Sequence, residues 1–519
     1  MGLGMPKATW TEVDLSHYVD TIIKGVSCVM GPTEKGPIAK PQRIGSAEQF
    51  ERIYGRAVKG FDFALVVNRA LAYGAVLWVS RVAHYTNAAN AATLTAVKAS
   101  GFLKDATPET PLNTLGVKAS SEGVWGNKIK VKVVPSGLDS TNLFSLRVFE
   151  GETLVESFDD LSMEEGAENY AANIKSSSIE LTDTGTGNNP APDFEVALSG
   201  GNDGLAGLAD ADYIGSKAAN TGFYAFGEVD DALQLATPDV VSPAVIAAGL
   251  AYCESRGDMV YIAETPFDTE PQSAVDFRLG RGTYSHAAFN SSYGAMYFGK
   301  PKVYDITQRK ERYVSAVGDV LGVIAFSDWS SNESRVPAGV RRGKLRNCLG
   351  VDVNVGTAAR AADGDYLCEN QLNPLCSFTD TGPVVWAAQT LQREASLLRE
   401  MNVRRMTIVM KKACTAYARA YIHQPNDPIE WRLFWLGLEP KFREWKAKRW
   451  IYDYRIECDQ NAKSLEDAKI NLPESVQRGE FHVKVFYKPM VGMKWILIQG
   501  IITRLDAKYD DSVVELAAV

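Results

Sequence analysis

The sequence predicts an α/β protein of several domains, with a β-rich insertion and an α+β region towards its C-terminal end. Three observations predict this class. At 519 residues the chain is too long for a single hydrophobic core. Helical patterns and short, almost entirely apolar strand patterns alternate on both sides of a central block, which is typical of a mostly parallel sheet. Inside that block, apolar and polar residues alternate with a period of two, as in antiparallel strands.

The points where these patterns change divide the chain into six expected segments. They are an extended N-terminal arm at 1–20, the first part of an α/β core at 21–89, a β-rich outer insertion at 90–202, the second part of the core at 203–401, an α+β domain at 402–505 and a C-terminal strand arm at 506–519.

The first part of the core begins with a short buried strand at Gly25–Gly31. Ser46 and Gln49 form a capping box that starts a helix ending at Gly55. A second helix is expected at Phe63–Tyr73, and the apolar run Val76–Val82 predicts another buried strand.

In the insertion, Ile129, Val131 and Val133 alternate with lysines. This pattern predicts an antiparallel strand with one buried and one polar face. We expect the polar face to be solvated.

The second part of the core returns to alternating helices and strands. A helix is expected at Ser242–Arg256, with Pro243 in its first turn and Gly257 as its stop. Strands are expected at Met259–Ala263, Val320–Phe326 and Val384–Ala388, and the last of these leads into a helix expected at Gln389–Met401.

The region from 402 onwards has the composition of an assembly module. An amphipathic helix is expected at Arg405–Ile422, and Pro440 is expected to interrupt a second apolar stripe that starts at Trp431. Two apolar strands, Phe481–Lys488 and Lys494–Leu505, predict a hairpin.

The two terminal arms are short strand candidates that lack an obvious partner. Unpaired backbone groups are costly to bury, so the arms must fold back on their own chain or pair with another copy. The arm residues concerned are Trp10, Val13, Leu15, Val513, Val514 and Leu516, and the hairpin residues that would accept them are Phe481, Val483, Val485, Trp495, Leu497 and Ile501.

A basic segment lies between the second stripe and the hairpin. It carries five cations against one acid, Glu444. Either it is a solvated helix face or it is a docking surface for an acidic protein partner. Its cations are Lys441, Arg443, Lys446, Lys448 and Arg449.

Composition and motifs exclude several functions. The net charge of −8 argues against nucleic-acid binding, and no apolar run is long enough to insert into a membrane, so we expect a soluble protein made in the cytoplasm. No metal or cofactor motif occurs, and no motif of an enzyme. His286 with Ser291 or Ser292 and Asp328 can be drawn as a catalytic triad, but such sets arise by chance in α/β proteins.

The seven cysteines have no metal-binding spacing. Cytosolic synthesis favours free thiols, and disulfides between subunits are the alternative if the finished particle leaves the cell. The cysteines are Cys28, Cys253, Cys348, Cys368, Cys376, Cys414 and Cys458.

A series of different short motifs is distributed along nearly the whole chain. They are Gly25–Pro37, Phe50–Gly55, Val76–Ala83, Glu122–Val131 (EGVWGNKIKV), Gly200–Gly204, Ser291–Tyr297, Val336–Gly339, Leu372–Leu375, Gly382–Leu391, Asn402–Arg405 (NVRR) and Gln424–Asp427 (QPND). In these blocks the chain resembles the tail sheath proteins of contractile phages, relatives of the sheaths of R-type pyocins and type VI secretion systems. It departs from them at Glu122, where proline is usual, and at Val314–Gly322, which replaces the usual approach to a following strand.

The resemblance implies a structural protein and not an enzyme. Such a subunit polymerises helically around a tail tube and contracts to drive the tube through the envelope of a target cell. The implied partners are other copies of itself, the tail tube protein, and the baseplate and tail terminator proteins. The resemblance also implies a place in the virion tail after assembly in the bacterial host, arms that pair with hairpins of neighbouring subunits, and a tube-facing role for Lys441–Arg449. A sheath of a phage-derived injection system or a pyocin-like particle is the alternative, and an α/β hydrolase is a more distant one.

Overall fold

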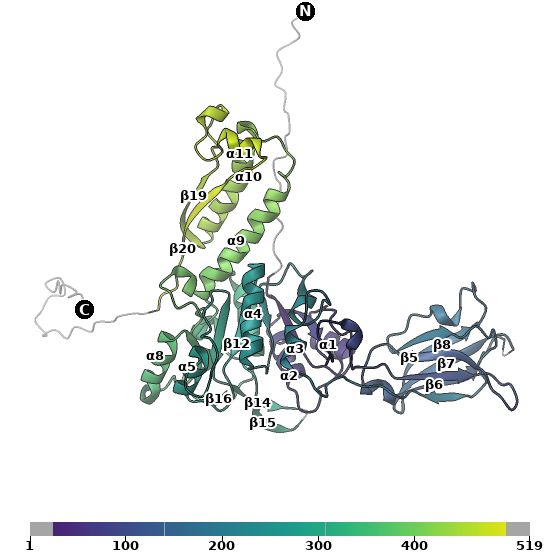
Figure 1. The fold of residues 1–519 in the computed structure, drawn as a ribbon. Coiled ribbons are helices and arrows are strands. Elements are labelled where there is room, and N and C mark those ends of the chain that lie inside the picture. The colour runs from purple at the N-terminus through teal and green to yellow at the C-terminus, as the bar shows by residue number, and fades with distance from the viewer. Residues whose placement is uncertain (1–23, 140, 307, 495–519) are drawn as a thin grey trace, which may run out of the picture.

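An eight-stranded sheet forms the centre of the molecule (Figure 1). The computed structural model describes residues 24–139, 141–306 and 308–494. The five inner pairings are parallel and the two edge pairings are antiparallel, so the predicted mostly parallel sheet is confirmed. In spatial order the strands are β18 (Gly382–Val385), β17 (Leu372–Phe378), β13 (Gly294–Phe298), β12 (Val260–Glu264), β11 (Gln234–Ala236), β1 (Val26–Gly31), β3 (Val76–Arg81) and β2 (Gln42–Ile44).

Helices cover both faces of this sheet, so the inner strands are apolar on both sides. In β1, Val26, Cys28 and Met30 contact one layer and Val29 contacts the other. The first layer holds α3 (Asp210–Ile214), α4 (Pro243–Arg256), α5 (Pro271–Leu279) and α8 (Ala361–Glu369). The second holds α1 (Ala47–Tyr54), α2 (Phe63–Leu71), α6 (Val317–Ser330) and the start of α9 (Met401–Arg419).

One predicted strand is wrong, because Val320–Phe326 lies inside α6. Nearly every residue of α6 is buried, so its sequence is apolar all round and carries no helical period. Two glycines let neighbouring groups approach closely. A Cβ at Gly318 would lie 2.3 Å from the carbonyl oxygen of Val66, and one at Gly322 would lie 2.3 Å from the Tyr73 ring.

The helix expected at Gln389–Met401 is also wrong. Residues 389–400 form a loop closed by a bridge between Gln389 and Glu400, with one short 3₁₀ turn at Leu397–Arg399. The helix starts only at Met401 and continues as α9. The side chain of Asn373 on β17 holds this loop to the sheet, donating to the Gln389 carbonyl and accepting from its amide.

The insertion is a separate antiparallel β-structure, set to one side of the core in Figure 1. Its own core includes Ile129, Val131 and Val133, as the alternation predicted. One sheet has the order β10-β6-β7-β8 and the other β4-β5-β9. The strands are β4 (Ser100–Lys104), β5 (Asn113–Ala119), β6 (Ile129–Pro135), β7 (Phe144–Glu150), β8 (Thr153–Leu161), β9 (Ile179–Asp183) and β10 (Glu195–Ala197).

Two of the sequence motifs meet where the insertion joins the core. Asn127 and Gly201 exchange two hydrogen bonds, and the Val124 amide donates to Asp203 at 2.6 Å. The guanidinium of Arg81, 1% exposed at the end of β3, donates to the carbonyl oxygens of Glu122, Asp203 and Gly36. Burial lowers the pKa of Arg81, although Asp203 and Glu122 oppose this.

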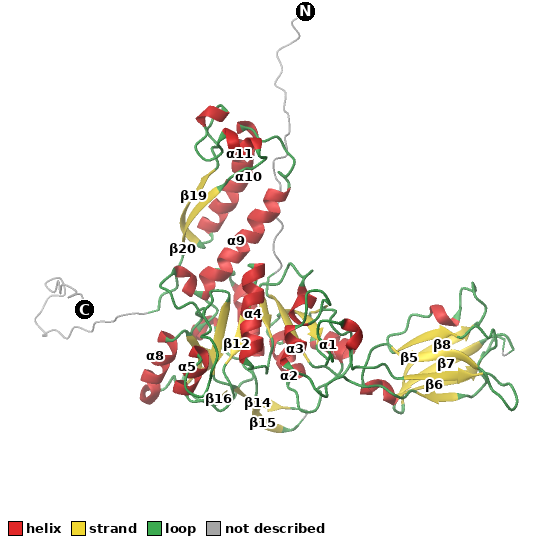
Figure 2. Cartoon of the chain, viewed as in Figure 1, coloured by secondary structure: helices red, strands yellow, loops and turns green. Residues whose placement is uncertain are grey.

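The C-terminal part rises from the core on α9 (Figure 2). Its helix α10 (Pro428–Ala447) runs through Pro440, so the expected interruption is wrong. Pro440 lies on the exposed side, where its ring has room, while Leu438 and Phe442 on either side of it are buried. The remaining elements of this part are β19 (Ile451–Glu457), α11 (Pro473–Gln477) and β20 (Lys484–Pro489).

The predicted hairpin is found only in part. Strand β20 (Lys484–Pro489) overlaps the expected Phe481–Lys488, but its described partner is β19, which pairs with it antiparallel from Ile451–Pro489 to Glu457–Lys484. Most of the expected second strand lies outside the described residues. A smaller sheet of β14 (Pro301–Asp305), β15 (Lys310–Tyr313) and β16 (Gly350–Val351) and the one-turn helix α7 (Gly339–Arg342) complete the core. None of the helices in the described part combines the length and apolarity that a membrane span requires.

Candidate assembly interface

A buried ion pair fixes α9 to the core. Arg405 donates to Asp328 of α6 at 2.5 Å, and both side chains are 0% exposed. Burial raises the pKa of Asp328 to about 6, although Arg405 opposes this. A charge pair of this kind, out of water, fixes the direction in which α9 leaves the core.

The neighbouring motif residues add two further joints. Asn402 donates to the carbonyl oxygens of Ser334 and Met490, and so ties the start of α9 to the segment that follows β20. Arg404 donates to the Ser292 hydroxyl and lies 4.1 Å from the centre of the Tyr293 ring. The NVRR motif is therefore a joint between three parts of the chain.

The QPND motif starts α10 and anchors the loop before β20. Asp427 accepts from the amides of Ile429 and Glu430, both at 2.9 Å, as an N-cap does. Asn426 donates to the carbonyl oxygen of Glu480 and accepts from the Trp431 indole. This loop carries Phe481, whose ring stacks on Trp431.

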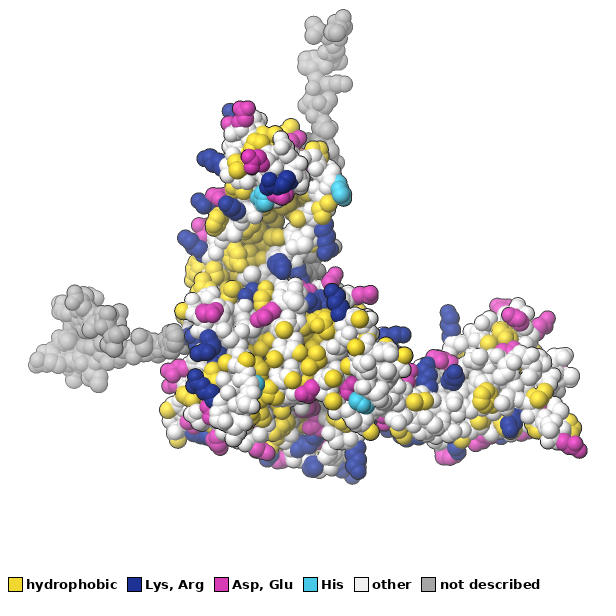
Figure 3. Space-filling model, in the orientation of Figure 1, with side chains coloured by type: hydrophobic (Ala, Val, Ile, Leu, Met, Phe, Trp, Pro, Cys, Tyr) yellow, Lys and Arg dark blue, Asp and Glu magenta, His cyan; other side chains and the backbone are white. Residues whose placement is uncertain are grey.

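The sheet of β19 and β20 is small and incomplete. Within the described residues these two strands pair only with each other, so the outer edge of each is open. Val483, Val485 and Tyr487 pack against the core cluster yet are only half-buried. Tyr452 and Phe486 on these strands are 63% and 48% exposed. Figure 3 shows hydrophobic side chains gathered on the C-terminal part of the molecule. A two-stranded sheet is marginal alone, and open edges are templates for further strands.

The structure locates half of the predicted acceptor hairpin. Phe481, Val483 and Val485 precede or lie on β20 and contact the hydrophobic cluster of the core and C-terminal part. The other predicted acceptors, Trp495, Leu497 and Ile501, lie outside the described residues. So do the arm residues Trp10, Val13, Leu15, Val513, Val514 and Leu516, and the pairing of the arms stays a prediction.

The net positive charge around the basic segment is smaller in the folded structure than the sequence of the segment indicates. Four of its cations form ion pairs, with carboxylates that come partly from outside the segment. Glu439 lies one turn earlier on α10, and Asp453 lies on β19. The pairs are Lys441–Glu444 at 3.0 Å, Arg443–Glu439 at 2.8 Å, Lys446–Asp453 at 2.8 Å and Lys448–Glu444; within the described part of the chain Arg449 forms no ion pair.

All seven cysteines are free within the chain. Cys28, Cys253, Cys376 and Cys458 are buried at 0–2% exposure, out of reach of a neighbouring molecule. The three half-buried thiols are Cys348, Cys368 and Cys414, and burial raises the pKa of each to about 11. Disulfides between subunits remain a prediction, and these three residues are the ones that can test it.

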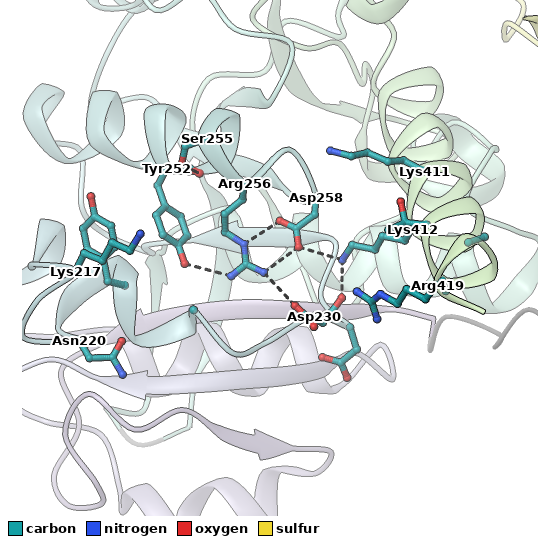
Figure 4. A pocket seen from close by; sticks show the side chains of 16 residues that line it. Lys217, Asn220, Asp230, Tyr252, Ser255, Arg256, Asp258, Lys411, Lys412 and Arg419 are labelled. Carbon is teal, nitrogen blue, oxygen red and sulfur yellow. Dashed lines mark hydrogen bonds and ion pairs between the residues drawn. The ribbon is translucent and has the colours of Figure 1, made fainter. Parts of the chain in front are cut away.

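A cavity of about 1050 Å³ separates the core from α9 (Figure 4). Arg256 at the end of α4 pairs with Asp258 at 2.8 Å, and Lys412 of α9 donates to the carbonyl oxygens of Asp230 and Ala232. Burial lowers the pKa of Lys412, while Asp258 opposes this. Lys412 also pairs with Asp258 at 3.6 Å. Its side chain therefore crosses the gap and, like Arg405, joins α9 to the core.

The triad drawn from the sequence is not assembled. Asp328 binds Arg405, and Ser292 binds Arg404. His286 stacks on Phe289 with ring centres 4.7 Å apart, and its Nδ1 contacts the Ala287 carbonyl oxygen. Among the described residues no group of three or more metal-ligating side chains is gathered.

Comparisons with known proteins agree with this architecture. Residues 394–503 match the family model of the phage tail sheath C-terminal domain. The chain is 26% identical over 241 residues to the tail sheath protein of Vibrio phage KVP40, which covers 46% of this chain and 34% of that protein. It is 24% identical over 287 residues to the tail sheath protein of Enterobacteria phage T4, covering 53% of this chain and 41% of that protein. The chain thus spans between a third and about two-fifths of the length of these two relatives.

Solved structures share the fold over most of the chain. The sheath tail protein Lin1278 from Listeria innocua aligns with a TM-score of 0.60 and 13% identity, covering 86% of this chain and 91% of that one. The helical sheath of the anti-feeding prophage in its contracted state aligns with a TM-score of 0.55 and 12% identity, covering 96% and 99%. The resemblance predicted from the sequence motifs is confirmed: the chain is similar to tail sheath proteins and has their mixed α/β fold.

Proposed function

We propose that the chain is a structural subunit of a contractile tail sheath, which polymerises helically around a tube and contracts to drive it through a target cell envelope. The observation that carries this proposal is the match of residues 394–503 to the sheath C-terminal domain. That segment contains α9, α10 and the open sheet of β19 and β20. The role is mechanical and not catalytic.

The open sheet is the proposed point of attachment between copies. Strands from the arms of neighbouring subunits would add to its free edges and cover the half-buried side chains of Val483, Val485 and Tyr487. Backbone hydrogen bonds supply the affinity of such an addition, and the alternating side chains supply its register. An added strand would permit large rotations of the subunits without their separation, because it would stay paired while the bodies of the subunits move.

The proposed contraction is a rotation of nearly rigid subunits. Support comes from the buried pair Arg405–Asp328 and the links from Lys412, which make α9 and the core one body. The extended sheath would be kinetically trapped, and contraction would release it into larger contacts between subunits while the arms act as hinges. Heterologous contacts that do not close produce the required helical assembly.

The proposed partners besides other copies are the tube, the baseplate and the tail terminator. The segment Lys441–Arg449 is the proposed tube contact. With Glu439, Glu444 and Asp453 its net charge stays positive, and exposed ion pairs contribute only ~0–1 kcal/mol each, so carboxylates of a partner can replace the internal ones.

We propose that the finished subunit belongs to a virion tail that is assembled in the bacterial cytoplasm. The sheath of an injection system is the second candidate, favoured by the likeness to the anti-feeding prophage sheath.

Negative-stain microscopy of the purified protein tests the main proposal. Tubes, discs or rings are the expected result, and a monomer at every concentration and salt would contradict it. Deleting residues 1–19 or 506–519 should leave folded protein that no longer polymerises. Sheath tubes of normal length from either truncation would contradict strand addition by the arms.

The tube contact has its own test. The triple variant K441E/R443E/K446E should form sheath that no longer retains tubes when the two proteins are produced together. Normal tube-filled particles from this variant would exclude the segment as a tube contact.

A further inference from the structure

A cationic surface around α7 lacks compensating charge. The stretch from Arg335 to Arg346 contains five bases and no acid. We call Arg335, Arg341, Arg342 and Lys344 the α7 cluster. Within residues 24–139, 141–306 and 308–494, none of these four side chains has an ion pair, in contrast to the segment Lys441–Arg449.

The members of the α7 cluster are close enough to repel one another. The pKa of Arg342 is lowered by its burial and then by the charges of Arg335 and Arg341. Arg341 and Lys344 are exposed. Holding like charges together without a counter-charge costs free energy that an anionic partner would recover.

An apolar group within the cluster favours a protein partner over nucleic acid. Val340 on α7, next to Arg341, is 49% exposed. Arginine is enriched in protein interfaces, and the centres of such interfaces are more apolar than the rest of the surface.

An acidic segment of the insertion has the complementary properties. Residues 156–174 contain six acids and no base. Glu164, Glu165 and Glu168 are exposed, and none has an ion pair in the part of the chain that the structure describes. We call these three residues the acidic loop.

The two surfaces lie towards opposite ends of the molecule. Helix α7 contacts β18, one edge strand of the central sheet, whereas the insertion leaves the core after β3, next to the other edge. Six strand spacings separate β18 from β3, which is roughly 30 Å. Opposite charges at opposite ends cannot neutralise each other within one subunit, but they can between successive subunits.

From this arrangement we infer that the α7 cluster of one subunit binds the acidic loop of a second copy of this chain. The contact is heterologous, so it extends from subunit to subunit without closing. It rests on the proposed polymerisation but is separate from the strand addition at β19 and β20. Because Arg341, Lys344 and the three glutamates of the acidic loop are exposed, the contact weakens as salt rises.

Complementation between two charge-reversed variants tests this contact. In R341E/R342E/K344E the α7 cluster keeps one positive charge against three negative ones, so both surfaces are acidic, and in E164R/E165R both are basic. The assembled fraction of each variant alone should therefore fall at least tenfold in sedimentation at about 0.15 M salt. In an equimolar mixture, every contact between the two variants joins opposite charges, so the mixture should assemble. The matched control E152R/E195R adds the same charge elsewhere on the insertion, and should assemble like wild type.

The outcomes separate this inference from the proposed function. Wild-type protein that never assembles contradicts the proposed function itself. If wild type assembles and either variant alone does too, or the mixture of two well-folded variants fails, the inference is wrong. If wild type binds a DNA duplex and R341E/R342E/K344E does not, with assembly unchanged, the α7 cluster would be assigned to nucleic acid and the inference would likewise be wrong. Circular dichroism of each variant verifies folding.

Discussion

The pair Arg405–Asp328 shows what one residue can decide in this molecule. Both groups are fully buried, and among the described residues the ion pair that each of them forms is with the other. We expect Arg405→Met to lower the free energy of unfolding by ~3–5 kcal/mol, because it leaves Asp328 buried and uncompensated. The double variant D328L/R405M should recover most of that loss, since it removes both charges. Urea unfolding monitored by tryptophan fluorescence measures the change; equal losses in the single and double variants would contradict the pairing argument.

The cysteines allow a second prediction at the residue scale. Thiolates are the reactive species, and burial raises the pKa of Cys348, Cys368 and Cys414 to about 11. In native protein at pH 7.5, Ellman's reagent should therefore react slowly with at most these three thiols. In denaturant all seven should react, provided that no disulfide joins subunits. Fewer than seven in assembled particles, restored by reductant, would support disulfides between copies.

Individual residues also mark the limit of sequence reasoning about charge. Lys441–Arg449 was expected to be a strongly positive patch because only Glu444 lies within it. Glu439 and Asp453 partly neutralise it in space, and Asp453 comes from a strand that the sequence did not predict. The α7 cluster was not singled out, although five bases without an acid between Arg335 and Arg346 are visible in the sequence. The signal was present, but only the absence of ion pairs among the described residues gave it meaning.

At the scale of elements, period and caps predicted well where one face is solvated. The helix Ser242–Arg256 and the strand at Ile129–Val133 were both found. The apolar run Val320–Phe326 was misassigned because α6 is buried on all sides, which removes the period that distinguishes helix from strand. The tendency of Pro440 to break the helix was overestimated. It lies on the exposed side of α10, and burial of Leu438 and Phe442 stabilises that helix.

The close packing of α2 against α6 gives a prediction for these elements. A Cβ at Gly318 would lie 2.3 Å from the Val66 carbonyl oxygen, and a backbone atom cannot move aside as a flexible side chain can. We expect Gly318→Ala to lower the free energy of unfolding by ~1–3 kcal/mol through overpacking. The same substitution at Gly364 of α8, where the nearest atom would be 3.4 Å away, is the matched control. It should raise stability by ~0.5–1 kcal/mol, because alanine is the better helix former. Thermal unfolding of both variants tests this prediction. A loss of stability in the Gly364 variant as large as that in the Gly318 variant would contradict the overpacking explanation.

At the scale of the whole molecule, the insertion is an independent unit on a narrow neck. All the residues of its hydrophobic core lie between Ala99 and Leu198. Val97 and Asn202 are joined by two backbone hydrogen bonds of 2.9 and 3.0 Å, so the chain enters and leaves the insertion as an antiparallel pair. Such a pair can be closed by a two-residue turn.

We therefore expect that replacing residues 98–201 by Asn-Gly leaves a folded core. Arg81 would lose its bond to the Glu122 carbonyl oxygen but keep Gly36 and Asp203, and the Gly36 amide would lose its bond to the Ser121 hydroxyl. A lost hydrogen bond to a charged group costs ~1.5–3 kcal/mol, which lowers the melting temperature by several degrees without unfolding the core.

The excised insertion, residues 98–201, should also fold alone and give a cooperative transition of its own. Because the deletion removes the acidic loop, the shortened core should stay monomeric under conditions in which the full chain assembles. Calorimetry of both pieces and sedimentation of the core test this together: an aggregated core would contradict the independence of the insertion, and a folded core that assembles like the full chain would contradict the contact between the acidic loop and the α7 cluster.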